Sequence, residues 1–487
     1  MGLRSGVTLE DLNSFGDVAA EDDAVLEYFV ATKAVEKIES GDAFLVLGRK
    51  GTGKTAIVRY FTEKQEGNRA RALSLKGYPW NVHAARVDFG ASNVEAYVSS
   101  WRYLIAVELA ALTLKQPHAW RCEDTKPLTQ FLNDNYGGVD PALSDVLRPA
   151  RLELGKLSLA PSIMGNALGG IDLERSKKDF QFGVELNALS SSIIDACHNV
   201  LRECGAGPIS LHFDELDQGI TSLDEERTRM LIGLVLAARD LKRESQSAGV
   251  AINPVVYLRS DLWEELQFSD KNKISQTLTL PLEWDSDSLA AMVSYRLRAK
   301  LDAEATWDDI AEPELMRGSQ AKWSHILART FLRPRDVISF LNSALAAYKS
   351  RPERGPALSN LDIVSSRDRY SNYLKLELDD EIGPHWPQWT EALQACSAIS
   401  TITFERDDFE REYDNRRSPV NKVSSDEALN YLYRFSAIGY RGGIGYGGSS
   451  WNFQYSDPEA GWDSAARNFK VHPGLKEYAR LREVRAT

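Results

Sequence analysis

The octapeptide Gly48-Arg-Lys-Gly-Thr-Gly-Lys-Thr55 constrains the fold of this chain more than any other feature. It has the spacing G-x-x-x-x-G-K-[ST], which is the signature of a P-loop. The apolar run Ala43 to Leu47 before it predicts a short buried strand, and the apolar residues between Thr55 and Glu63 predict a buried helix after it. A glycine turn between a strand and a helix predicts an α/β fold, a P-loop NTPase core built on a parallel sheet.

Each residue type in this loop has a physical reason to bind a triphosphate. Glycines allow positive φ angles, so several backbone N–H groups can turn toward one point, and the helix start adds a positive dipole end. Lys54 supplies a full charge to the β- and γ-phosphates, and the Thr55 hydroxyl is a ligand for Mg²⁺. The predicted ATP-binding residues are Gly48, Arg49, Lys50, Gly51, Thr52, Gly53, Lys54, Thr55 and Ala56.

A second apolar run ends in two acids and completes the predicted site. Ile209 to Phe213 reads as a strand that delivers Asp214 and Glu215 at its carboxyl end, where α/β sheets bind their ligands. We expect Asp214, together with Thr55, to hold Mg²⁺, and Glu215 to polarise the attacking water. Asp217 fits a supporting role or a solvated side chain equally well.

A third strand, Pro254 to Arg259, ends in a cation followed by a helix cap at Ser260-Asp261. In a P-loop ATPase an arginine at this position can sense the γ-phosphate, so Arg259 joins Glu215 and Lys54 as a candidate catalytic residue. The alternative is a surface arginine that closes a strand. His83 to Phe89, which carries Asp88, reads as a further strand of the sheet.

Composition bounds the class of protein. A chain of 487 residues is expected to form about two to four domains, and four cysteines are too few for a disulfide framework. We find no apolar run of about 18 residues and no apolar core of a signal peptide, so we expect a cytoplasmic protein without a membrane span. The net charge of −12 argues against a protein coated in basic residues for nucleic acid.

The C-terminal stretch from Ala466 to Thr487 departs from this balance, because it carries six basic residues and two acidic ones, a local charge of +4. A solvated helix face is one interpretation, and a contact with DNA beside a winged helix is the other. A helix predicted from Asp426 to near Gly439, the glycine loop after it and the aromatic strand Trp451 to Tyr455 indicate such a winged helix. Domains of this kind contact DNA or dock proteins.

Periodicity and linker composition divide the chain into four parts. Gly16 to Gly41 is predicted to be an amphipathic helix that leads into the first strand, and Ala91 to Lys115 a long helix. Arg333 and Arg335 flank Pro334 at a predicted helix start, where they either reach a nucleotide phosphate or pair with Asp336. The predicted domains are the P-loop core 1–282 with an irregular, hairpin-bearing insertion at 116–176, a helical lid 283–350, a linker and helix 351–385, and a winged-helix-like domain 386–487.

Taken together, these motifs resemble a bacterial family of AAA+-related P-loop ATPases close to the STAND and KAP-type groups. The resemblance rests on FLVLGRKGTGKTAI, HFDELD, VVYLRSDLWEEL, FLRPRDVISF and LNYLYRFSAIGY. It covers most of residues 15 to 350 and, more loosely, the C-terminal domain. It implies an AAA+-like core, a helical lid that includes Arg333 and Arg335, and a cytoplasmic role often found in mobile or phage-defence loci.

Three functions follow from these observations. The first is a Mg²⁺-dependent ATPase that acts as a nucleotide-driven switch or remodeller, as a homo-oligomer and with a separate effector or regulator protein. The second is an ATP-regulated module that binds DNA through the C-terminal domain. The third is a scaffold that retains ATP with little turnover and docks a partner protein.

Overall fold

The computed structural model describes residues 8–64, 68–76, 94–147, 180–216, 224–443 and 449–483. The chain forms two compact units. The core unit comprises Ala31–Arg49 and Lys54–Leu282, and the lid unit comprises Met1–Val30, Lys50–Gly53 and Glu283–Thr487. Within the described residues, no helix combines the length and the apolar character that a bilayer crossing needs. The four predicted domain boundaries stay predictions.

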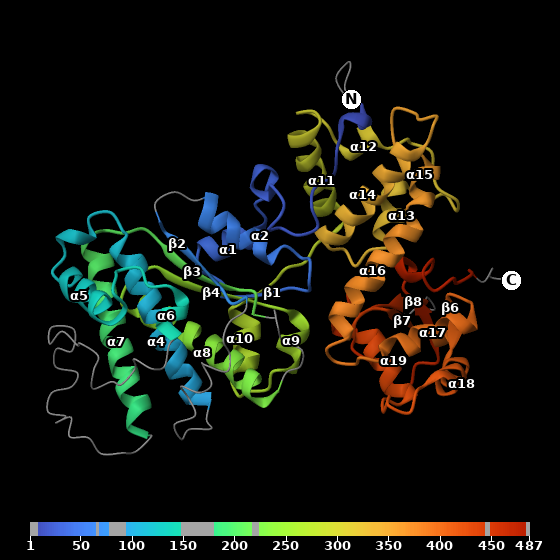
Figure 1. The fold of residues 1–487 in the computed structure, drawn as a ribbon. Helices are drawn as coiled ribbons and strands as arrows, with labels where there is room; N and C mark the ends of the chain where they lie inside the picture. Colours follow the sequence, from blue (N-terminus) through green and yellow to red (C-terminus); the bar gives the residue numbers. More distant parts are fainter. Residues whose placement is uncertain are drawn as a thin grey trace. The chain divides into compact units, whose positions relative to one another are not determined.

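The core unit is built on a five-stranded parallel sheet with the strand order β2-β3-β4-β1-β5 (Figure 1). The middle strand β4 pairs with β1 through Leu45↔Val256 and with β3 through Phe213↔Val256. Every residue of β3 and β4 is buried, as expected of parallel strands covered on both faces. The strands are β1 (Leu45–Leu47), β2 (Ala70–Ser74), β3 (Ile209–Asp214), β4 (Ile252–Leu258) and β5 (Thr279–Pro281).

Helices cover both faces of this sheet, with α1 and α2 on one side and α8 on the other (Figure 1). The long helix α4 packs against both α7 and α8, and its small and apolar residues are almost all buried. The helical elements are α1 (Lys33–Glu39), α2 (Lys54–Arg59) continued by a π-helical turn (Tyr60–Lys64), α4 (Val94–Leu114), α5 (Thr125–Tyr136), α6 (Leu143–Leu147), α7 (Phe180–Glu203), α8 (Glu225–Ser247), α9 (Ser260–Glu265) and α10 (Lys271–Thr277).

Part of the predicted insertion is more regular than the sequence suggested. Residues 116–147 contain α5 and α6, because Leu128, Phe131 and Leu132 recur at helical spacing and Gly137 ends α5 in the left-handed conformation. The predicted hairpin and glycine-rich stretch of the insertion lie outside the described residues, as do the predicted strand His83 to Phe89 and Asp217. The predicted helix Ala91 to Lys115 corresponds to α4.

The predicted helix Gly16 to Gly41 is wrong over its first half. The chain forms only a 3₁₀ turn (Val25–Tyr28) before α1. The reason lies in Asp23, which is buried and accepts hydrogen bonds from Tyr28 and from Arg296 (2.8 Å). The conformation of the acidic segment is therefore set by a buried ion pair within the lid unit, which local helix propensity cannot predict.

The helices of the lid unit between Ser286 and Ile382 share one apolar core. Buried leucines of α11, α14 and α16 belong to this core together with aromatic residues of the C-terminal region. The helices are α11 (Ser286–Lys300), α12 (Trp307–Ile310), α13 (Lys322–Leu327), α14 (Pro334–Ser350), α15 (Asn360–Ser365) and α16 (Arg367–Ile382).

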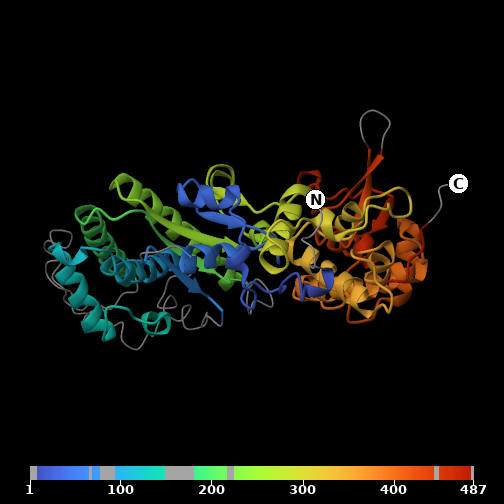
Figure 2. The same ribbon diagram turned by 90° about the horizontal axis from the view of Figure 1, so that it is seen from above.

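The C-terminal region has the helix and strand sequence of a winged helix, α17-β6-α18-α19-β7-β8-β9, with the antiparallel order β6-β9-β7-β8. Strands β7 and β8 form a projecting hairpin (Figure 2). The predicted helix up to Gly439 is too long, because Ser436 is left-handed (φ 62°) and β7 follows. The elements are α17 (Trp389–Ile399), β6 (Thr403–Glu405), α18 (Arg406–Arg416), α19 (Ser425–Arg434), β7 (Ile438–Gly443), β8 (Ser449–Asn452) and β9 (Asn468–Val471).

The predicted fold class is confirmed in its architecture: the chain has an α/β fold with a parallel sheet, followed by a helical region and a C-terminal α/β region. The P-loop connects β1 to α2, and β4 is inserted between β1 and β3. This insertion separates the loop from the acidic residues by one strand and places both at the carboxyl edge of the sheet.

Candidate nucleotide and metal site

The glycine loop between β1 and α2 adopts the backbone conformation that its sequence predicts. Gly51 and Gly53 have φ angles of +82° and +97°, a region that side-chain-bearing residues rarely adopt. At the start of the loop, the Gly48 N–H donates to the Leu258 carbonyl (3.2 Å) and ties the loop to the end of β4. The curled turn therefore depends on the glycines and on the neighbouring strand.

Lys54 is the first residue of α2, and its ammonium group lies inside the curve of the loop. The Nζ atom donates to the carbonyls of Gly48 (2.7 Å) and Arg49 (3.0 Å), both on the chain that leads into the loop. Its charge also interacts with the carboxylate of Asp214. The lysine and the first acid of the predicted site are therefore electrostatic neighbours.

Asp214 is the last residue of β3 and has only 6% of its surface exposed. Burial raises the pKa of its carboxyl group to about 6, against the opposing effects of the Glu215 backbone, the Thr55 hydroxyl that hydrogen-bonds to it, and Lys54. A buried carboxylate beside a threonine hydroxyl is a pair of oxygen donors of the kind that Mg²⁺ accepts. The two residues predicted to hold the metal are therefore in contact.

This pair fits a cation that keeps other ligands. In the parts of the chain that the structure describes, no three His, Cys, Asp or Glu side chains gather as a complete metal site. Mg²⁺ in nucleotide sites takes one or two protein ligands and completes its shell with phosphate oxygens and water. Asp214 and Thr55 match that requirement.

Glu215 follows β3 in a left-handed conformation, with φ of 60°. This region is uncommon for a residue with a side chain, and such residues gather at functional sites. The carboxylate accepts a hydrogen bond from the hydroxyl of Ser74, the last residue of the adjacent strand β2. Sequence reasoning missed Ser74, because its contact depends on β2 pairing with β3.

Arg259 follows β4 and lies at the same edge of the sheet, because β4 runs between β1 and β3. Its guanidinium makes two hydrogen bonds to the carboxylate of Asp261, at 3.0 Å and 2.5 Å. The arginine is therefore held at the predicted edge, with its charge compensated by Asp261.

Arg333 is among the most deeply buried charged residues described, with 1% of its surface exposed. Its guanidinium donates to both oxygens of Asp336 (2.9 Å each), to Glu381 and to the carbonyl of Lys50 (2.9 Å). The sequence left two alternatives open for Arg333, a contact with a nucleotide phosphate or an ion pair with Asp336. The structure shows the ion pair with Asp336.

The neighbouring Arg335 makes weaker contacts. Its Nε donates to the Val18 carbonyl (2.9 Å), and its guanidinium lies 3.4 Å from the Glu377 carboxylate. Its backbone N–H points to the Gly51 carbonyl at 3.4 Å. Both predicted lid arginines thus contact loop residues of the lid unit through backbone carbonyls.

Further side chains of the lid unit hold the same loop residues. The Lys50 ammonium pairs with Asp380 (2.7 Å) and lies 3.5 Å from Glu377, both on α16. The indole N–H of Trp284 donates to the Thr52 carbonyl (2.9 Å). Sequence reasoning missed these three contacts, since each partner is more than 200 positions away from the loop.

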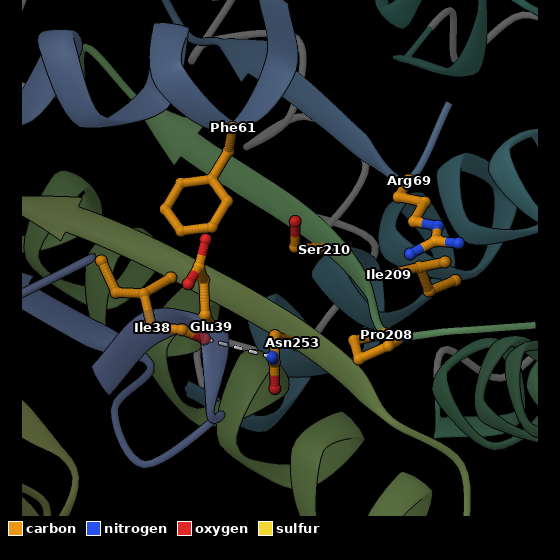
Figure 3. A pocket seen from close by; sticks show the side chains of 8 residues that line it. All are labelled: Ile38, Glu39, Phe61, Arg69, Pro208, Ile209, Ser210 and Asn253. Carbon is orange, nitrogen blue, oxygen red and sulfur yellow. Dashed lines mark hydrogen bonds between the residues drawn. The ribbon is translucent and has the colours of Figure 1, made fainter. Parts of the chain in front are cut away.

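A separate pocket of about 350 Å³ opens on the core unit (Figure 3). It is lined by residues at the amino ends of the strands, among them Arg69, Ser210 and Asn253. The Asn253 amide donates to the Ile38 carbonyl at 3.2 Å. Because the P-loop and Asp214 follow the carboxyl ends of parallel strands, this pocket is not the predicted nucleotide site.

Comparison with known proteins gives a family match for part of the chain and a distant curated relative. Residues 287–379 match a family described as the FunZ-associated C-terminal helical domain. The chain is 24% identical over 359 residues to the putative transposon gamma-delta 80.3 kDa protein of Escherichia coli (strain K12), over 70% of this chain and 48% of that protein. The chain therefore spans about half the length of that curated relative.

Two solved structures are similar at a distance. The Orc1 protein of Aeropyrum pernix, solved in complex with DNA, has a TM-score of 0.35 and 11% identity, over 93% of this chain and 91% of that chain. Cdc6p of Pyrobaculum aerophilum has a TM-score of 0.30 and 13% identity, over 94% and 96%. The comparisons thus give a family match for residues 287–379 and a transposon-associated relative.

Proposed function

We propose that this chain is a Mg²⁺-dependent ATPase. One observation carries the proposal: the buried Asp214 carboxylate lies at the end of β3 against the Thr55 hydroxyl and near the Lys54 ammonium. The loop whose glycines Gly51 and Gly53 have positive φ angles leads directly into Lys54 and Thr55. An anion cradle, a lysine and a pair of metal-binding oxygens are together the parts that phosphoryl transfer to water needs.

Each residue has a separate role in the proposed reaction. The loop 48–53 and Lys54 bind the triphosphate, and Thr55 and Asp214 hold Mg²⁺, which neutralises charge that develops on the phosphate oxygens. Glu215, kept in place by Ser74, orients the attacking water. Arg259, which follows β4, senses the γ-phosphate by contacting it. Its ion pair with Asp261 is then either broken or shared with the phosphate.

The proposed cellular role is that of a nucleotide-driven switch or remodeller. The loop residues Lys50, Gly51 and Thr52 contact Asp380 of α16, the backbone N–H of Arg335 on α14, and the Trp284 side chain, respectively. A phosphate that reorders the loop would therefore also change these contacts. The proposal includes a homo-oligomer and a separate effector protein. The transposon-associated relative supports a place in a mobile genetic element, and a phage-defence locus is the alternative place that the family resemblance implies.

The test is a comparison of Glu215→Gln with the matched control Glu226→Gln, an exposed acid of α8 in the same unit. Removing the base while keeping the shape should leave ATP binding intact and lower turnover by about 100-fold or more. ATP binding is measured by calorimetry and phosphate release under single-turnover conditions. Equal turnover by the wild type and both variants would remove Glu215 from the mechanism.

The second candidate, an ATP-regulated docking module, is favoured by the winged-helix-like region. Its helix α19 exposes Asp426 and Glu427 in the first turn, and acids at that place repel DNA phosphates. We therefore expect α19 to serve protein contacts rather than major-groove readout. DNA affinity that is lost when residues from Asp426 onward are deleted, and that falls steeply with salt, would reverse this ranking.

A further inference from the structure

A group of cations in the lid unit lies outside the proposed ATPase site. Arg329 follows α13, Arg367 begins α16, Lys470 lies on β9, and Lys476 follows β9. Their charges interact: Arg329 acts on both Arg367 and Lys470. Three segments far apart in sequence thus bring like charges together, although like charges repel. We call Arg329, Arg367 and Lys470 the cation cluster.

Two of these guanidinium groups have N–H donors that no residue satisfies. Arg329 has 7% of its surface exposed, and its Nη1 donates to the His325 carbonyl (3.2 Å), whereas its buried Nε has no acceptor among the described residues. The buried Nε of Arg367 likewise has none. An unsatisfied buried donor is costly, and more so when it carries charge. The two Nε–H groups can therefore take an acceptor beyond the described residues.

His325 orients this arrangement without adding charge. Its Nε2 accepts from Nη2 of Arg367 (2.6 Å), so its proton is on Nδ1, which donates to the Gln320 side chain (3.1 Å). Burial, with Arg329 and Arg367, lowers the pKa of His325 to about 3. The neutral ring therefore holds Nη2 of the Arg367 guanidinium, while its buried Nε keeps no acceptor among the described residues.

The nearby acids do not balance the cations. Glu477 and Glu483 both act on Arg329 and Arg367, and Glu483 also pairs with Lys476 at 2.5 Å. One Glu477 oxygen is itself buried without a donor. Burial, with the charge of Arg367, lowers the pKa of Arg329 to about 10, and burial lowers the pKa of Lys470. Arg329, Arg367, Lys470 and Lys476 are four cations against the two acids Glu477 and Glu483, which leaves a local excess of positive charge.

We propose that Arg329, Arg367 and Lys470 form a binding site for a phosphate-type oxyanion. The buried Nε–H groups of Arg329 and Arg367, which have no acceptor among the described residues, can donate to planar or tetrahedral oxyanions, and Lys470 adds a point charge. The ligand is either free phosphate or a phosphate of a nucleic-acid backbone. The second source is consistent with the surroundings of Lys470, whose Nζ lies 5.8 Å from the Trp451 ring centre, opposite Arg441 on β7.

The experiment uses the full chain carrying Lys54→Ala, so that phosphate cannot occupy the proposed nucleotide loop. Inorganic phosphate is titrated by calorimetry against this protein and against a version with Arg367→Gln and Lys470→Gln, at constant ionic strength. Both positions are partly exposed, so the substitutions are expected to leave the fold intact, which circular dichroism checks. Arg411→Gln, which removes an exposed cation of α18, is the matched control.

We expect saturable phosphate binding that becomes at least tenfold weaker in the double variant and is unchanged by Arg411→Gln. A second arm measures duplex DNA affinity against salt. If the phosphate belongs to DNA, the double variant lowers the slope of log K on log salt by about two, since each contact contributes about 0.9. An unchanged slope with weakened phosphate binding assigns the site to a free anion. Phosphate binding that is absent, or equal in all variants, overturns the proposal.

Discussion

Replacing Asp214 by Asn should stabilise the core unit while it weakens Mg²⁺-ATP binding. Burial raises the carboxyl pKa from 3.8 to about 6, and at about 1.36 kcal/mol per pH unit the ionised form costs about 3 kcal/mol. Asparagine avoids this cost and keeps an oxygen that can accept from Thr55. A residue kept for metal binding is expected to be suboptimal for stability.

The pH dependence gives the prediction a definite sign. An acid whose folded pKa is raised destabilises the fold only when it is ionised, so the penalty is absent below pH 3.8, grows as pH rises, and is complete above about pH 6. The advantage of Asp214→Asn should therefore be about 3 kcal/mol at pH 8 and less than about 2 kcal/mol at pH 5.

Hydrogen exchange by mass spectrometry is the assay, with peptides that cover β3. It reports local opening free energies, which suits a chain of two compact units whose global unfolding need not be a single step. Glu226→Gln, an exposed acid of the same unit, is the control and should change β3 exchange little at either pH. A variant that is less stable than wild type at pH 8, or equally stabilised at both pH values, would refute the reasoning.

Two further pairs of variants test the lid unit by thermal unfolding. Arg333→Gln should lower the free energy of unfolding by about 3–5 kcal/mol, because Asp336 and Glu381 would remain buried without their cation. Arg335→Gln should lower it by less than about 1 kcal/mol, and equal losses in the two variants would contradict the assigned burial. Phe469→Ala removes a fully buried side chain of β9 and should cost about 3–5 kcal/mol, whereas Tyr478→Ala, at an exposed position, should cost far less. Equal melting temperatures of these two variants would contradict the described core.

The fold was predictable where local pattern and tertiary structure agree. The apolar runs before Gly48 and Asp214 predict β1 and β3, because parallel strands covered on both faces are apolar throughout. The failures have tertiary causes. The segment around Asp23 follows a buried pair with Arg296, and the helix α19 stops at Ser436, whose left-handed φ leads into β7.

The residues of the candidate site likewise divide into those that the sequence predicts and those whose contacts depend on the fold. The loop, Lys54, Thr55 and Asp214 follow from motif spacing, and the structure brings Asp214 together with Thr55. Ser74 was not predictable, because its contact with Glu215 follows from the pairing of β2 with β3, which no motif encodes. The ion pair that occupies Arg333 was foreseen only as an alternative, since a sequence does not reveal which charges become buried.

The cation cluster was invisible to sequence reasoning for a related reason. Its members lie on α13, α16 and the end of the chain, and none of them belongs to a motif. The sequence shows an excess of basic residues after Ala466, but not that Lys470 meets Arg329, 141 positions earlier. Only the fold brings these charges together.

The central claim is that the loop and the acid at the end of β3 bind one Mg²⁺-ATP. Calorimetric titration of the full chain with ATP, with and without Mg²⁺, tests it most directly, with Lys54→Ala as the disabled form and Lys64→Ala, on the π-helical turn after α2, as the control. We predict tight binding that requires Mg²⁺, survives Lys64→Ala and is lost in Lys54→Ala. ATP binding that is absent from the wild type, or unaffected by Lys54→Ala, would contradict the account.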